Sequence, residues 1–132
     1  MVIIARTKVK TQRNKSAVSK NSRWSKRKAH LMDKISKEFA DIVRKKLKNH
    51  VKEIILFGSH ARGDFTEGSD YDFLIVVDRR RKTDEKILQE IGTEFLDRYE
   101  ALITDILCDE KEWEKKKHFP IGLNILKEGV RL

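Results

Sequence analysis

The stretch from Ile54 to Asp78 constrains the fold of this chain more than any other. Two short apolar runs, 54–57 and 73–77, enclose a segment rich in glycine and polar residues. Each run has the length of a buried strand and is too short for a helix, and the second is rich in β-branched residues. The stretch therefore predicts two strands joined by a glycine turn and a polar loop.

Two aspartates stand at the start of the second predicted strand. Asp70 and Asp72 are two residues apart, and residues with this spacing point to the same face of a strand. Neighbouring carboxylates repel each other unless a cation lies between them. Mg²⁺ binds through one or two carboxylates together with substrate phosphates. We therefore interpret the pair as Mg²⁺ ligands, the alternative being two polar residues that merely flank a turn.

Gly58 and Ser59, which follow the first predicted strand, are suited to binding an anion. Glycine allows the backbone to approach a ligand closely, and the free N–H groups of a turn that leads into a helix attract phosphate. A phosphate-binding turn opposite a pair of metal-binding carboxylates is typical of nucleotide chemistry.

The same segment resembles a known family. G-S-H-A-R-G-D-F-T-E-G-S-D-Y-D closely resembles the signature G-S-x-A-R-G-x-x-x-x-x-S-D-x-D of the minimal nucleotidyltransferases, which belong to the DNA polymerase beta superfamily. The defining positions are all present: Gly58, Ser59, Ala61, Arg62, Gly63, Ser69, Asp70 and Asp72. The resemblance extends from about residue 35 to the end of the chain. It implies an α/β fold in which helices pack against a small mixed sheet.

The resemblance implies transfer of a nucleoside monophosphate from a triphosphate, most readily ATP, to an acceptor hydroxyl. One or two Mg²⁺ ions would bind the aspartate pair, and the nucleotide would bind Gly58, Ser59, Arg62 and Ser69. Arg62 would either contact the phosphates or brace the loop through a carboxylate, and the sequence leaves both roles open. His60 occupies the variable position of the signature, where we expect a spectator role, the alternative being a contact with a phosphate.

A third aspartate of the family comes from the strand after the next helix, and Asp105 matches it by location. In that role Asp105 would complete the metal site or accept the proton of the acceptor hydroxyl. The alternative is a carboxylate on an edge strand that faces water, since alternation puts Thr104 and Ile106 on the opposite face.

Charge is distributed unevenly along the 132 residues, which have the length of one domain. Residues 1–50 hold 16 Lys or Arg against 3 Asp or Glu, whereas residues 51–132 hold 14 against 18. Residues 1–30 contain no acidic residue and no regular period. We therefore expect a basic arm over 1–30, disordered or loosely ordered, in front of a nucleotidyltransferase domain over 31–132. The arm would suit nucleic acid or an acidic protein.

The remaining elements follow from periodicity and capping residues. A basic turn, 78–82, follows the second strand and is either solvated or close enough to neutralise a triphosphate. Helices are expected at 31–47, 83–98, 109–117 and 120–128, and a third strand at 101–108.

The acceptor is predicted from the resemblance alone. Minimal nucleotidyltransferases often act beside a small helical HEPN protein as a toxin–antitoxin pair, and can attach AMP to a tyrosine of that partner. A HEPN-type partner or self-association would then complete the acceptor site. The alternatives are an antitoxin that acts by contact without turnover, and an RNA-directed transferase or RNA-binding protein that uses the basic arm.

The cellular location is inferred from what the sequence does not contain. No apolar run approaches the length of a membrane span, and the N-terminus does not resemble a secretory signal. The single cysteine, Cys108, cannot form an internal disulfide and lies in an apolar run, so we expect it in the core. These features predict a cytoplasmic protein with no membrane association.

Overall fold

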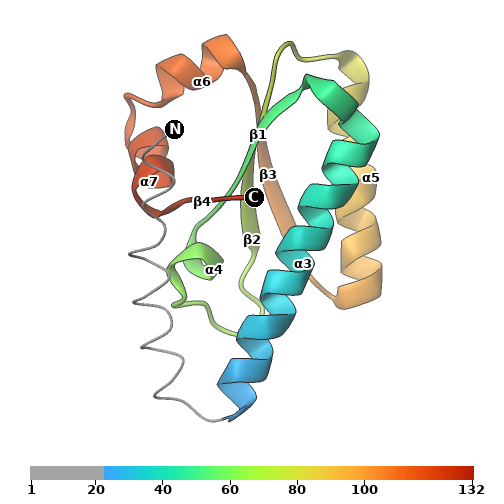
Figure 1. Cartoon of the computed structure of the whole chain (residues 1–132), viewed down its shortest axis with the longest axis vertical. Coiled ribbons are helices and arrows are strands. Elements are labelled where there is room, and N and C mark those ends of the chain that lie inside the picture. Colours follow the sequence, from blue (N-terminus) through green and yellow to red (C-terminus); the bar gives the residue numbers. More distant parts are fainter. Residues whose placement is uncertain (1–22) are drawn as a thin grey trace.

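The structure, a computed structural model, describes the backbone of residues 23–132 and the side chains from Lys34 onward. The elements in chain order are α3 (Arg23–Leu47), the 3-10 turn η1 (Lys48–His50), β1 (Val51–Phe57), α4 (Ser59–Arg62), β2 (Tyr71–Val77), α5 (Lys82–Tyr99), β3 (Ile103–Asp109), α6 (Glu110–Lys116), α7 (Pro120–Glu128) and β4 (Val130–Arg131) (Figure 1).

The four strands form one mixed sheet in the order β3-β2-β1-β4. β1 runs antiparallel to β2 and to β4, and β2 runs parallel to β3 through the crossover helix α5. Helices α3 and α5 lie on one side of the sheet and α6 and α7 on the other (Figure 1). This arrangement confirms the predicted α/β class with a small mixed sheet.

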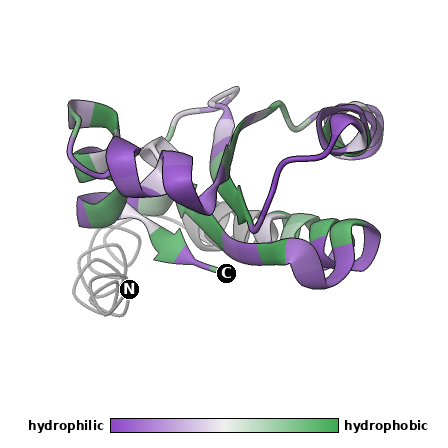
Figure 2. Cartoon of the chain, turned by 90° about the horizontal axis from the view of Figure 1, so that it is seen from above, coloured by the Kyte–Doolittle hydropathy of each residue, from purple (hydrophilic) through white to green (hydrophobic). Residues whose placement is uncertain are grey.

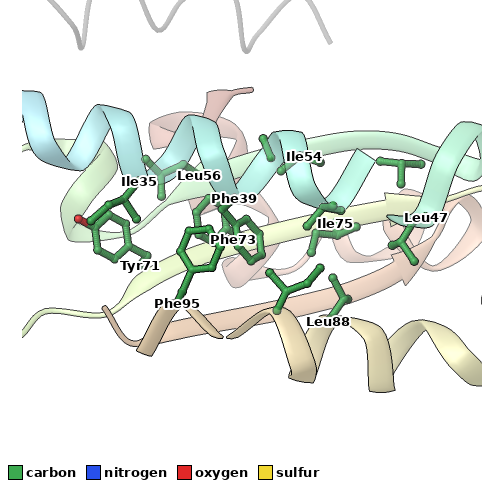
Figure 3. Packing of buried hydrophobic residues seen from close by; sticks show 14 of the residues in the cluster. Ile35, Phe39, Leu47, Ile54, Leu56, Tyr71, Phe73, Ile75, Leu88 and Phe95 are labelled. Atoms are coloured by element: carbon green, nitrogen blue, oxygen red, sulfur yellow. The ribbon is translucent and has the colours of Figure 1, made fainter. Parts of the chain in front are cut away.

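The larger core lies between the sheet and helices α3 and α5. Apolar residues of α3 recur every three or four positions, which places Ile35, Phe39 and Val43 on one buried face. The Phe39 ring stacks on Phe73 of β2 with a centroid distance of 4.1 Å and meets Phe95 of α5 edge to face at 5.7 Å (Figure 3). These aromatic contacts fix both helices on the sheet.

A smaller core fills the other face of the sheet, beneath α6 and α7. Its buried members are Ile55, Phe57, Leu74, Val76, Cys108, Trp113 and Ile125. The cysteine is 2% exposed, which confirms its predicted place in the core. Successive residues of β2 alternate between the two cores, so this central strand is apolar on both faces except at Asp72.

The N-terminal end of α3 differs most from the predicted helix bounds. α3 begins at Arg23, eight residues before the predicted start, so part of the predicted arm is helical. Residues 1–22 lie outside the described part of the chain, and the domain boundary remains a prediction. The helices predicted at 109–117 and 120–128 are confirmed as α6 and α7, with Asp109 as the N-cap of α6, Pro120 as the first residue of α7 and Gly129 as its C-cap.

The outward faces of the helices are largely polar, although Leu96 of α5 and Ile121 and Leu123 of α7 are exposed apolar residues. Figure 2 shows hydrophilic and hydrophobic residues alternating along the helical ribbons, as amphipathic helices require. No helix among the described residues has the length and apolar composition needed to cross a membrane.

Candidate active site

The candidate site lies where β1 ends and β2 begins. Gly58 joins β1 to the short helix α4 with a φ of +78°, a conformation that favours glycine. A Cβ atom at this position would collide with Oδ2 of Asp72. Gly58 is therefore required both by the turn and by the close approach of the carboxylate.

Asp72 projects from the start of strand β2 on the face of the smaller core, at the end of the sheet where β2 begins. Its register partner on β1 is Phe57, and Asp70 lies two residues before it, just outside the strand. Burial raises the pKa of Asp72 above its ordinary value, and the negative charges of Asp70 and Glu128 raise it further, while Arg62 partly offsets them. This local excess of negative charge favours a bound cation.

Glu128, at the last turn of α7, lies between the glycine turn and Arg62. Its Oε2 accepts a hydrogen bond of 2.8 Å from the Gly58 N–H group. Arg62 Nη1 donates to both carboxylate oxygens of Glu128 at 3.0 Å, and Arg62 Nε donates to Asp64 at 3.0 Å. Of the two roles that the sequence left open for Arg62, this geometry favours bracing of the loop through carboxylates.

These contacts also change which donors a phosphate would meet. The Gly58 N–H group is already bound by Glu128. Among the described residues, the N–H and Oγ of Ser59 and the Nη2 group of Arg62 have no hydrogen-bond partner. The donors that remain available to an anion at this turn are therefore those of Ser59 and Arg62, whereas the Gly58 N–H group is occupied by Glu128.

Ser69 stabilises the polar loop that leads to the aspartates. Its Oγ accepts a hydrogen bond of 2.9 Å from the Thr66 N–H group, and this contact within the loop stabilises the loop's conformation. The His60 ring stacks on Tyr71 with a centroid distance of 3.8 Å, and its Nε2 lies 2.9 Å from the Ser69 carbonyl oxygen. His60 thus links α4 to the loop.

Asp105 is not brought into this group. On β3 it pairs in register with Phe73, whose side chain is in the larger core, whereas Thr104 pairs with Asp72. Paired residues of parallel strands share a face, so Asp105 faces α5 on the opposite side of the sheet from Asp72. It lines a groove there with Glu85, Leu88 and Gly92. Asp105 is half-buried in this groove, so its placement fits neither the water-facing alternative nor a position beside the aspartate pair.

The basic turn 78–82 lies at the wrong end of the sheet to reach the site. Asp72 is the second residue of β2 and the turn follows its last residue, Val77, which separates them by roughly 17–20 Å at about 3.3 Å per residue. Residues 78–82 are exposed, so the solvated alternative fits the structure.

The two aspartates could hold a metal ion whose remaining ligands come from water or from substrate phosphates. No group of three or more His, Cys, Asp or Glu residues in the described part of the chain has the geometry of a metal site. Two carboxylates are nevertheless what Mg²⁺ takes from a protein when substrate phosphates and water supply the rest. The donor set fits Mg²⁺ bound together with a nucleotide.

Comparison with known proteins decides the family. The model of the family described as "Nucleotidyltransferase domain" matches residues 36–130. The chain belongs to this nucleotidyltransferase family. The match includes the glycine turn, Asp70, Asp72 and Glu128, so the whole candidate site lies inside the family's domain.

Relatives of this nucleotidyltransferase share most of its length. A Methanocaldococcus jannaschii protein named "Putative protein adenylyltransferase MJ0604" is 39% identical over 97 residues, which cover 74% of this chain and 93% of that protein. A second protein of the same organism, "Putative protein adenylyltransferase MJ1305", is 34% identical over 99 residues, covering 73% of this chain and 67% of that protein.

A solved structure confirms the fold. The "Crystal structure of a putative nucleotidyltransferase from Sulfolobus solfataricus" has a TM-score of 0.56 and covers 84% of this chain and 87% of its own. Its sequence identity is 22%, so this likeness concerns the fold alone.

Two residues of the nucleotidyltransferase site were missed by the reasoning from sequence. Glu128 lies 70 residues from Gly58, and no local pattern connects them. Thr104 donates from Oγ1 to Asp70 Oδ2 at 2.8 Å. The alternation of β3 was a usable signal for Thr104, because it places Thr104 and Asp105 on different faces and only one of them can face the aspartate pair.

Proposed function

We propose that this nucleotidyltransferase moves AMP from ATP to a hydroxyl group of another protein in a Mg²⁺-dependent reaction. The observation that carries the proposal is the approach of the Asp72 carboxylate to the Gly58 turn, with Asp70 beside it. The names of the two relatives, which refer to protein adenylyl transfer, support the choice of AMP and of a protein acceptor.

Asp70 and Asp72 would hold the metal. Burial and two neighbouring negative charges raise the pKa of Asp72, and a divalent cation would relieve the repulsion among these carboxylates. When bound, Mg²⁺ would neutralise phosphate charge and polarise the phosphoryl group under attack.

The chain's own residues would bind and orient the triphosphate. Ser59 offers its N–H and hydroxyl groups, and Arg62 offers Nη2 while Glu128 and Asp64 hold the rest of its guanidinium in place. The oxygen of the acceptor hydroxyl would form a bond to the α-phosphorus as the bond to the β-phosphate oxygen breaks. Pyrophosphate would leave, and the hydroxyl proton would pass to a base or to water.

The identity of the acceptor remains a prediction. We propose a tyrosine of a HEPN-type toxin partner, in which case the chain would act as an antitoxin, or a second copy of the chain. A contact-only antitoxin and an RNA-directed enzyme are the competing functions, and the basic residues that would serve the latter lie largely outside the described structure.

The test is transfer of label from α-labelled ATP, with Mg²⁺, into a lysate of the cells from which the chain derives. The wild-type protein is compared with Asp72→Asn, and with Asp97→Asn as a matched exchange on the exposed surface of α5. A labelled protein that disappears only with Asp72→Asn supports the proposal. Label in RNA would favour the RNA-directed function, and bound ATP without any transfer would favour the contact-only function. Absence of both label and ATP binding would overturn the proposal.

A further inference from the structure

Thr104 occupies the position beside the aspartate pair where a third carboxylate was expected. It is the second residue of the edge strand β3 and pairs in register with Asp72. Its side chain therefore lies on the same face of the sheet as that aspartate. Its Oγ1 donates a hydrogen bond of 2.8 Å to Oδ2 of Asp70.

Asp70 needs such an anchor because it precedes β2 and has no register partner in the sheet. The neighbouring backbone is tied to the approach to β3, since the Tyr71 N–H donates to the Leu102 carbonyl oxygen at 2.9 Å. The carboxylate itself is held by the hydroxyl of Thr104. A carboxylate oxygen has two lone pairs, so Oδ2 can accept from Thr104 and still bind a cation.

We propose that Thr104 is a positioning residue that orients the Asp70 carboxylate toward the metal. This inference rests on the proposed function, because it concerns the metal-binding role of Asp70 and Asp72. The metal would thus be held by two carboxylates, Asp70 and Asp72, with one orienting hydroxyl. Hydrogen-bonded partners of metal ligands restrict the ligand to its binding geometry, and their loss typically lowers metal affinity or activity by about 10–100-fold.

Thr104→Val tests the hydroxyl alone, because valine has nearly the same shape and is favoured in strands. Thr104→Ser keeps the hydroxyl and removes the methyl group. Thr93→Val is the matched control, since Thr93 donates its hydroxyl to the Gln89 carbonyl oxygen within α5, away from the site. Thr104→Ala serves if valine disturbs the edge strand, and thermal unfolding followed by circular dichroism checks the fold of each variant.

The primary measurement is binding of Mn²⁺ alone to the full chain, followed by the loss of the electron paramagnetic resonance signal of free Mn²⁺. We expect Thr104→Val to weaken Mn²⁺ binding by about 10–100-fold, with Thr104→Ser close to wild type and Thr93→Val unchanged. The concentration of Mg²⁺ that gives half-maximal label transfer should rise in the same order.

Two results would overturn the inference while leaving the metal site intact. One is wild-type Mn²⁺ affinity in both Thr104→Val and Thr104→Ala. The other is an equal loss in Thr104→Ser, which would make the methyl group the important part of the side chain. If wild type fails to bind Mn²⁺ and Asp72→Asn changes nothing, the proposed metal site itself is wrong and the role of Thr104 falls with it.

Discussion

Replacing Asp105 by asparagine tests whether this residue takes part in the reaction, as the family resemblance implies, or lies away from the site, as the structure places it. The carboxylate of Asp105 faces α5, across the sheet from Asp72. Among the described residues it has no hydrogen-bond partner. We therefore expect Asp105→Asn to keep label transfer within about twofold of wild type, a change of roughly 0.4 kcal/mol in the barrier. Asp72→Asn should lose at least about 1000-fold, or roughly 4 kcal/mol.

The same substitution should stabilise the protein at neutral pH. Burial raises the pKa of Asp105 above its ordinary value, and the negative charge of Glu85 raises it further. A carboxyl whose pKa is raised by folding destabilises the native state above the folded pKa, and this penalty disappears below the unfolded pKa. Asp105→Asn should therefore raise the Tm at pH 7, and the gain should shrink toward pH 4.

The assay combines label transfer from α-labelled ATP with thermal unfolding at pH 7 and pH 4. Glu85→Gln is a useful companion, because it removes the nearby charge and should give a smaller gain of the same sign. A folded Asp105→Asn protein that is as inactive as Asp72→Asn would refute the reasoning, since it would require β3 to present the opposite face to the site.

Three further predictions concern the turn and the far end of the sheet. Gly58→Ala should abolish ATP binding and cost about 1–3 kcal/mol, because the new methyl group meets the Asp72 carboxylate and φ is positive; undiminished ATP binding in calorimetry would contradict this. In the metal-free protein, Glu128→Gln should lower the pKa of Asp72 toward its ordinary value, since one negative charge is removed, and an unchanged carboxyl ¹³C titration would argue against this proximity. His50→Gln should lose about 2–3 kcal/mol in urea unfolding, because the buried Asp84 carboxylate loses the ring nitrogen 3.2 Å away; a loss below about 0.5 kcal/mol would show the contact to be unimportant.

Much of the fold could be read from local patterns. The lengths and composition of the apolar runs 54–57 and 73–77 identified the two central strands. Strands β1 and β2 are only a few residues longer than these runs. The positions of α6 and α7 were also predictable, because helix caps depend on neighbouring residues. The start of α3 was missed because the basic residues before Leu31 carry no apolar period.

The sequence by itself indicated that Asp70 and Asp72 lie together beside a glycine turn, because the short separation of two residues along the chain and the conformation of one turn are local properties. Only the tertiary structure decided what surrounds them. The register of β2 against β3 put Thr104 on their face and Asp105 on the other. The return of the chain through α7 brought Glu128 to Gly58 and Arg62. Such contacts depend on how elements distant in sequence pack, and a one-residue change of register would exchange the faces of a strand.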